Sequence, residues 1–96
     1  MNLTPLTAGK VAGTGTLMLT GQHGAGGTVG GVLISTDGTN AAVVILREND
    51  SSGRIIFDVS SKTPQFPVAP LRLETDKVYY DISGTGASAM LYEWND

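Results

Sequence analysis

The glycine-rich stretch Gly21–Gly31, GQHGAGGTVGG, comes closest among the segments of this sequence to a ligand-binding loop. A phosphate-binding P-loop has a lysine directly after its second conserved glycine, and no lysine occurs between Lys10 and Lys62. A dinucleotide-binding fingerprint needs a glycine three positions after Gly26, where Val29 stands, and a helix behind the loop. The stretch therefore predicts neither a phosphate site nor a dinucleotide site.

His23, the only histidine of the chain, lies inside this stretch. A catalytic histidine needs a fixed imidazole beside a positioned nucleophile, and the flanking glycines provide no such rigidity. The alternative to an ordinary exposed loop residue is a metal-binding or pH-sensing role at an oligomer axis. That alternative requires His23 side chains of different subunits to converge.

Acidic residues offer two further candidates for chemistry. Glu48, Asn49 and Asp50 stand in a row, whereas calcium loops space their ligands at alternating positions, so we expect a solvated turn. Asp58 and Asp81 would act as a hydrolytic pair only if the strand order brought them to one cleft. We predict no catalytic residue, no cofactor and no metal ligand, and we expect a protein that is not an enzyme.

The aromatic residues point to binding surfaces rather than to catalysis. They are Phe57, Phe66, Tyr79, Tyr80, Tyr92 and Trp94. We expect most of these rings in the core or in a subunit interface, because they bury large areas and Tyr and Trp keep a polar atom. Tyr79, Tyr92 and Trp94 offer an alternative, a platform on which a sugar would stack.

Composition narrows the classes of partner. With 96 residues the chain fits one domain, since a chain of this size buries only about 65% of its unfolded surface. A net charge of −3 without a Lys or Arg cluster argues against nucleic acid. The absence of cysteine excludes disulfides and thiolate metal sites. No apolar run approaches the roughly 20 residues that span a bilayer, so no membrane contact is expected.

Charge is distributed unevenly along the sequence. Lys10 is the only charged residue among the first 36, and the other 14 charged residues follow. Because residues 11–36 also contain apolar groups, they are not typical of a disordered tail, and we expect another protein to cover them. The predicted interaction residues of the chain are Leu17, Leu19, His23, Val29, Tyr79, Tyr92 and Trp94.

Short β-branched or aromatic runs between turn residues predict the secondary structure. The expected strands are residues 14–20, 31–35, 41–47, 54–60, 71–73, 78–83 and 88–94. Their spacing and the lack of helical periodicity predict an all-β fold, an antiparallel β-sandwich or jelly-roll-like barrel of about seven to eight short strands. Residues 1–13 are expected to form an N-terminal arm, and residues 14–96 a single β-sandwich domain.

Several strands carry more specific expectations. The apolar run of residues 41–47 indicates burial on both faces. In the next strand Ile55, Phe57 and Val59 should share one face. Three prolines at 64, 67 and 70 indicate an edge strand or crossover segment. Turns are expected at residues 37–40, 49–53 and 84–86, the first and the last of them as hairpins.

Residues 31–93 follow a recognisable order of strands and turns. The segments are GVLIST (31–36), AVVILRENDSSGRIIFDV (42–59), PVAPLRL (67–73) and KVYYDISGTGASAMLYE (77–93). This succession resembles small accessory proteins of tailed bacteriophage virions. The resemblance implies a β-sandwich that assembles as an oligomer on a capsid or tail, as a decoration, cement or fibre-base protein. It carries no catalytic residues.

The functional expectation combines this resemblance with the composition. We expect a non-enzymatic structural protein of a phage virion, a capsid decoration or cement protein assembled in the host cytoplasm. Its expected partners are further copies of itself, with a trimer favoured by the resemblance, and the major capsid protein or another virion protein. The alternatives are a carbohydrate- or receptor-binding β-sandwich module of a tail or head fibre, with a glycan as ligand, and a small hydrolase.

Overall fold

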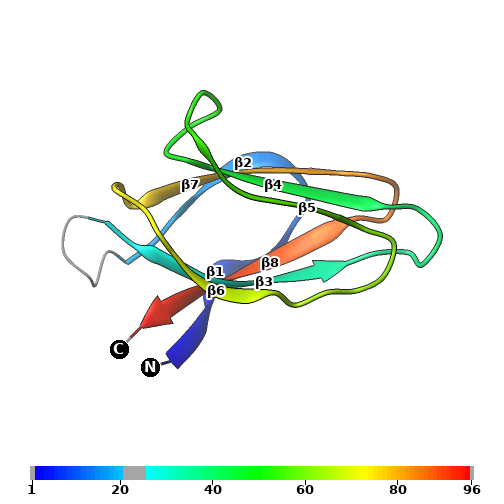
Figure 1. Ribbon diagram of the computed structural model, residues 1–96, viewed down its shortest axis with the longest axis horizontal. Helices are drawn as coiled ribbons and strands as arrows, with labels where there is room; N and C mark the ends of the chain where they lie inside the picture. The colour runs from blue at the N-terminus through cyan, green and yellow to red at the C-terminus, as the bar shows by residue number, and fades with distance from the viewer. Residues whose placement is uncertain (1, 21–25, 96) are drawn as a thin grey trace.

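The computed structural model describes residues 2–20 and 26–95, which form two packed β-sheets (Figure 1). The eight strands are β1 (Asn2–Val11), β2 (Gly13–Met18), β3 (Thr28–Ser35), β4 (Ala42–Glu48), β5 (Ile55–Ser61), β6 (Val68–Arg72), β7 (Lys77–Ser83) and β8 (Ser88–Asn95). Sheet A has the strand order β1-β8-β3-β6 and sheet B the order β2-β7-β4-β5. All pairings are antiparallel, which confirms the predicted all-β sandwich. No helix in the described part of the chain is long and apolar enough to cross a membrane.

The strand order is that of a jelly roll. The pairs β1–β8, β2–β7, β3–β6 and β4–β5 are those of one long hairpin whose tip is the β4–β5 turn. The pairs β3–β8 and β4–β7 join the arms of this hairpin into two sheets. Only β4 and β5 are therefore neighbours both in sequence and within a sheet.

The predicted hairpins at residues 37–40 and 84–86 are wrong, because the chain crosses from sheet A to sheet B at the first turn and from sheet B to sheet A at the second. Gly84 and Gly86 do make the turn, with φ angles of 111° and 74°. Turn residues fix a reversal of the backbone, but they do not fix which strand pairs with which.

The two edge strands of sheet A are β1 and β6. Residues 2–11, expected as an arm, instead form β1, where Leu3 pairs with Trp94 and Val11 with Ala89. The proline-bearing segment ends in β6 at the opposite edge, as the sequence predicts. The N-terminal segment is thus part of the sandwich, because its extended backbone finds the last strand of the chain as a partner.

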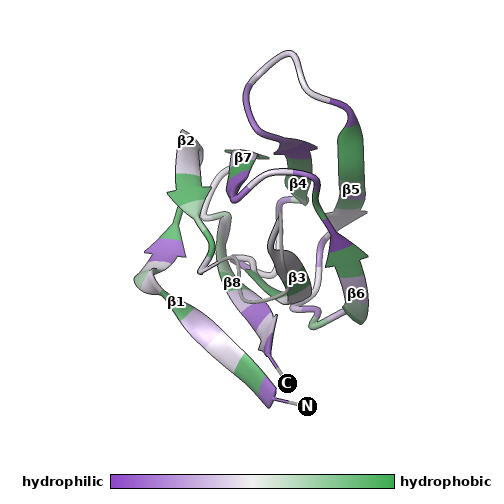
Figure 2. Ribbon diagram, turned by 90° about the vertical axis from the view of Figure 1, so that its left-hand side faces the viewer, coloured by the Kyte–Doolittle hydropathy of each residue, from purple (hydrophilic) through white to green (hydrophobic). Residues whose placement is uncertain are grey.

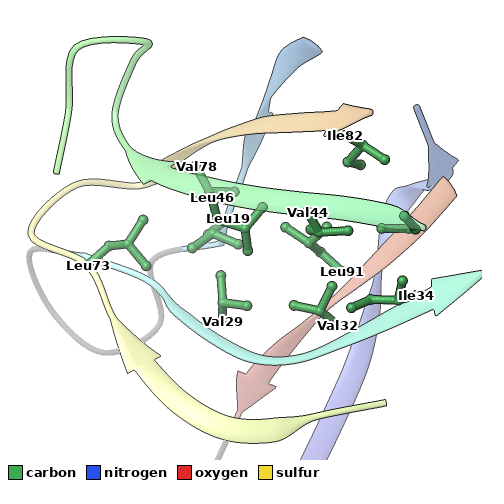
Figure 3. Packing of buried hydrophobic residues seen from close by; sticks show 12 residues of the cluster. Leu19, Val29, Val32, Ile34, Val44, Leu46, Leu73, Val78, Ile82 and Leu91 are labelled. Atoms are coloured by element: carbon green, nitrogen blue, oxygen red, sulfur yellow. The ribbon is translucent and has the colours of Figure 1, made fainter. Parts of the chain in front are cut away.

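Side chains from the inner faces of both sheets form the core (Figure 3). They are Leu19, Val29, Val32, Ile34, Ala42, Val44, Leu46, Leu73, Val78, Ile82, Ala89 and Leu91. Strand β4 alternates between buried and half-buried residues, so its expected burial on both faces is wrong. Val43 and Ile45 are only half-buried, because among the described residues no further layer covers the outer face of sheet B.

A bulge changes the expected pattern of β5. Leu46 pairs with Phe57 while Arg47 pairs with Ile55, so Ile56 has no partner across the strand pair. Phe57 and Val59 pack against the core, as does Ile56, whereas Ile55 is 47% exposed. The expectation that Ile55 shares the inner face is therefore wrong.

Hydrogen bonds from the backbone stabilise the turns at residues 37–40 and 49–53. The Asp37 carboxylate accepts bonds from the Asn40 and Thr39 N–H groups, at 2.7 and 2.8 Å. These bonds, the Asn40 backbone bond foremost, lower the pKa of Asp37 from its ordinary value of 3.8. Bonds from Ser52, its hydroxyl foremost, likewise lower the pKa of Asp50. Both turns form where the sequence predicts them.

Candidate functional site

The outer face of sheet A gathers apolar and aromatic side chains from four segments. In β8 the buried Leu91 and Glu93 alternate with Tyr92 and Trp94, which therefore point outward. Strand pairing adds residues opposite them in β1, β3 and β6. We call this surface the apolar face; it consists of Leu3, Leu33, Phe66, Val68, Met90, Tyr92 and Trp94.

Phe66 connects the apolar face to the segment before β6. Its ring centroid lies 5.1 Å from that of Tyr92, with 57° between the ring planes. This tilted geometry is favourable for aromatic pairs. Phe66 is nevertheless 45% exposed and Val68 48% exposed, so both side chains remain accessible to solvent.

The glycines of β3 make room for these side chains. A Cβ at Gly31 would lie 3.1 Å from Phe66 Cε1. At Gly30 a Cβ would lie 2.5 Å from Leu3 Cδ2 and 2.9 Å from Trp94 Cβ. Side chains at both positions would push the rings away from the sheet.

Two further glycines lie against the interior of the same chain. A Cβ at Gly26 would overlap the Leu73 carbonyl oxygen, and one at Gly27 would lie 2.5 Å from Leu19. The backbone here is also bonded to the residue that follows β6, since Leu73 N–H donates to Gly27 O at 2.9 Å. We expected another protein to cover this stretch, but its described glycines are covered by the chain's own residues.

Glu93 is a buried carboxylate in the core side of sheet A. It is 2% exposed, and its Oε2 accepts bonds from Thr20 N–H at 2.9 Å and from the Thr20 hydroxyl at 2.7 Å. These bonds attach the segment after β2 to sheet A. No motif of the sequence singles out Glu93, although its spacing of two residues from Leu91 and four from Ala89 places it on the inner face with them.

Glu48 occupies the equivalent place in sheet B. It follows Leu46 on the inner face of β4 and is buried, which corrects the expectation of a solvated turn at this residue. Its Oε1 lies 3.3 Å from Arg54 Nε, and its Oε2 accepts a bond from the Glu74 N–H. Among the described residues, no group of three metal-ligating side chains includes it.

A pocket of about 410 Å³ lies beside Glu48 at one end of the sandwich. Its lining residues are Gly26, Arg54, Arg72, Leu73 and Glu74. Arg54 is paired with Glu48, and the lining adds one further guanidinium, of Arg72, and one carboxylate, of Glu74, so the four formal charges cancel. The pocket therefore has no net charge that would select an anion or a cation.

The predicted interaction residues fall in different places. Tyr92 and Trp94 lie on the apolar face, whereas Tyr79 lies opposite Arg47 on the outer face of sheet B. The alternative of a sugar platform made of all three residues is therefore wrong, because β7 and β8 belong to different sheets. His23 lies outside the described residues.

Three predicted interaction residues belong to the interior. Leu19 and Val29 are core residues, and Leu17 packs against the core while half-buried. Their side chains are therefore not open to another protein in this structure. These residues are buried because alternate apolar side chains of β2 and β3 lie on the strand faces that point between the sheets.

The two candidate hydrolytic acids do share a surface. Asp58 and Asp81 are each the partner of Ile45, on the strands flanking β4. Two strand spacings, about 10 Å, separate their backbones across the outer face of sheet B. Neither residue lines the pocket described above. The chain matches no protein-family model, no curated protein and no solved structure.

Proposed function

We propose that this chain is a non-enzymatic structural protein of a phage virion, a capsid decoration or cement protein that stabilises the particle. The observation that carries the proposal is the apolar face. Its tilted Phe66–Tyr92 pair, with Trp94 in the same strand as Tyr92, offers aromatic area on one side of a small sandwich. Contiguous apolar surfaces of this kind mark contacts with other proteins.

Three further properties support a role in assembly. Jelly rolls occur in viral capsid proteins, although lectins use the same architecture. A small chain without disulfides gains stability from association, because its own core is limited. The resemblance of residues 31–93 to phage accessory proteins favours a trimer, assembled in the host cytoplasm and bound to the major capsid protein.

Location on the particle is the direct test. We expect mass spectrometry of purified virions to detect the chain in many copies, and immunogold labelling to place it on the head. Light scattering of the purified chain should give an oligomer. A stable monomer that is absent from virions would overturn the proposal.

Matched tyrosine variants test which surface makes the contact. We expect Tyr92→Ser to reduce binding to particles that lack the chain by at least tenfold, because it removes an aromatic ring from the apolar face. Tyr79→Ser, which removes an outward tyrosine from sheet B, should bind within about twofold of the wild type. Equal losses in both variants would contradict the assignment of the apolar face.

A carbohydrate- or receptor-binding module is the second candidate. The exposed Phe66 ring and the half-buried Tyr92 and Trp94 are also suited to stacking against a sugar. A glycan array followed by a crystal soak separates the two functions. A sugar stacked on Trp94 or Tyr92 would favour the fibre module over the decoration protein.

A further inference from the structure

The four edge strands of the sandwich differ in how their free edges are protected. Natural edge strands avoid unwanted pairing through proline, charge, bulges or short length. Strand β1 has Pro5, Lys10 and a shift of register between them. Strand β6 has five residues, including Pro70, and β5 has a bulge and the exposed Asp58.

Strand β2 has none of these protections. Its sequence GTGTLM contains no charge and no proline, and all six of its residues pair with β7 without a register shift. Sheet B continues on one side of β2 only, with β7. Alternate N–H and C=O groups of β2 therefore point away from the sheet. Thr14 and Thr16 are exposed, and Met18 is 61% exposed.

We propose that β2 pairs antiparallel with β2 of a second copy of this chain, which joins sheet B of the two copies into one continuous sheet. The free backbone groups of β2 select an extended strand as the partner. The protections on β1, β5 and β6 oppose pairing with those strands of another copy. Among the described strands, β2 itself is the one unprotected edge that can pair with it.

Charge favours the same arrangement. Each copy has a net charge of −3, but Lys10 is the only charged residue among the first 36. Contact through β2 therefore brings two acidic molecules together without placing like charges opposite each other. Figure 2 shows β1 and β2 on the side of the sandwich away from β5 and β6. A two-fold axis at β2 makes the contact self-complementary, and it closes after two copies.

This contact goes beyond the proposed function, because it does not use the apolar face. It predicts an even number of copies. The β2 contact alone would form a dimer, and the trimer of the proposed function, made through a separate surface, would convert this into a hexamer. In either arrangement the outward Thr16 lies directly opposite or diagonal to Thr16 of the second copy, since paired residues share a face.

Charge variants at Thr16 test the pairing. We expect light scattering of the wild type to give an even number of copies, and the mass of both Thr16→Lys and Thr16→Glu to fall by half. An equimolar mixture of the two variants should restore the wild-type mass, because opposite charges then face each other. Ser60→Lys, an exposed change on β5, is the matched control and should keep the wild-type mass.

Hydrogen exchange provides a measurement that needs no variant. The β2 amides that point away from β7 should exchange at least tenfold more slowly at high protein concentration than at low concentration. An odd number of copies, a wild-type mass in the Thr16 variants or no rescue in the mixture would overturn the pairing. We expect Tyr92→Ser to lose particle binding and to keep the even mass of the wild type. That result would support the apolar face as the particle contact and β2 as the contact between copies, independently of each other.

Discussion

The two sheets of this sandwich are alike on their inner faces and different on their outer faces. Each central strand pair places aliphatic residues in the core and one buried carboxylate at its end, Glu93 in β8 and Glu48 in β4. Outside, sheet A presents Phe66 and Tyr92, whereas sheet B presents charged residues such as Asp81. The inner faces therefore stabilise the fold, and the difference between the outer faces is the reason for assigning the proposed particle contact to sheet A.

Truncation of the core tests the equivalence of the inner faces and should have the largest effect. Leu46→Ala in sheet B and Leu91→Ala in sheet A each remove a fully buried side chain. Each should lower the free energy of unfolding by about 3 kcal/mol, measured by urea denaturation. The two losses should agree within about 1 kcal/mol, since the same transfer and cavity terms apply. A much larger loss in one sheet would show that the core belongs mainly to that sheet.

The buried carboxylates should show the first difference between the sheets. Glu93→Ala leaves the Thr20 N–H and hydroxyl without their acceptor, which should cost about 2 to 3 kcal/mol. Glu48→Ala should cost less, about 1 to 2 kcal/mol, because it leaves only the Glu74 N–H without an acceptor, while its other partner, Arg54, is 63% exposed and stays hydrated. Differential scanning calorimetry measures both. Glu93→Gln, which retains an acceptor oxygen, is the conservative control and should recover part of the loss.

The outer faces should differ in their contribution to the stability of a single chain. Tyr92→Ala removes the ring pair with Phe66 and should cost about 1 kcal/mol. Tyr79→Ala should cost less, because no aromatic partner of Tyr79 is found in the described residues. Urea denaturation at a concentration where both variants are monomeric compares them. Equal losses of unfolding free energy in the two variants would mean that the Phe66–Tyr92 ring pair does not stabilise the fold.

The turn between β3 and β4, one of those that connect the two sheets, should have the smallest effect, and that effect depends on pH. Asp37 lies between β3 of sheet A and β4 of sheet B, and hydrogen bonds lower its pKa below 3.8. A carboxylate with a lowered pKa stabilises the fold at pH values above its unfolded pKa, and the contribution is lost as the pH falls through the folded value. Asp37→Ala should therefore lower the melting temperature slightly at pH 7, and the difference from wild type should shrink below about pH 4. If the difference in melting temperature between Asp37→Ala and wild type does not change with pH, the titration of Asp37 does not contribute to stability.

The positions of the strands were predictable from local sequence. Seven expected runs coincide with β2 to β8 within a few residues, because β-branched residues and turn residues act locally. The turn at Asp37 also formed as its side chain and the following glycine indicate. Tyr92 and Trp94 were correctly placed on one face of their strand, since side chains alternate in any extended segment.

The candidate site as a whole was not predictable in this way. Tyr79 has the same outward position in β7 as Tyr92 has in β8, yet the two lie on different sheets. Phe66 reaches Tyr92 only because its segment crosses over Gly31. The interior places of Leu19 and Val29 likewise depend on which sheet lies opposite. Such contacts join residues distant in sequence, and no local pattern encodes them.

The sequence by itself therefore determined an all-β chain, the approximate bounds of most strands and the alternation of residues within them. Tertiary structure decided the jelly-roll order, made a strand of residues 2–11 and brought Phe66, Tyr92 and Trp94 together on the outer face of sheet A. The physical reason is that alternation and turn geometry depend on neighbouring residues, whereas pairing depends on partners as distant as Leu3 and Trp94. Burial of both inner faces selects among the possible pairings, and that selection requires the whole chain.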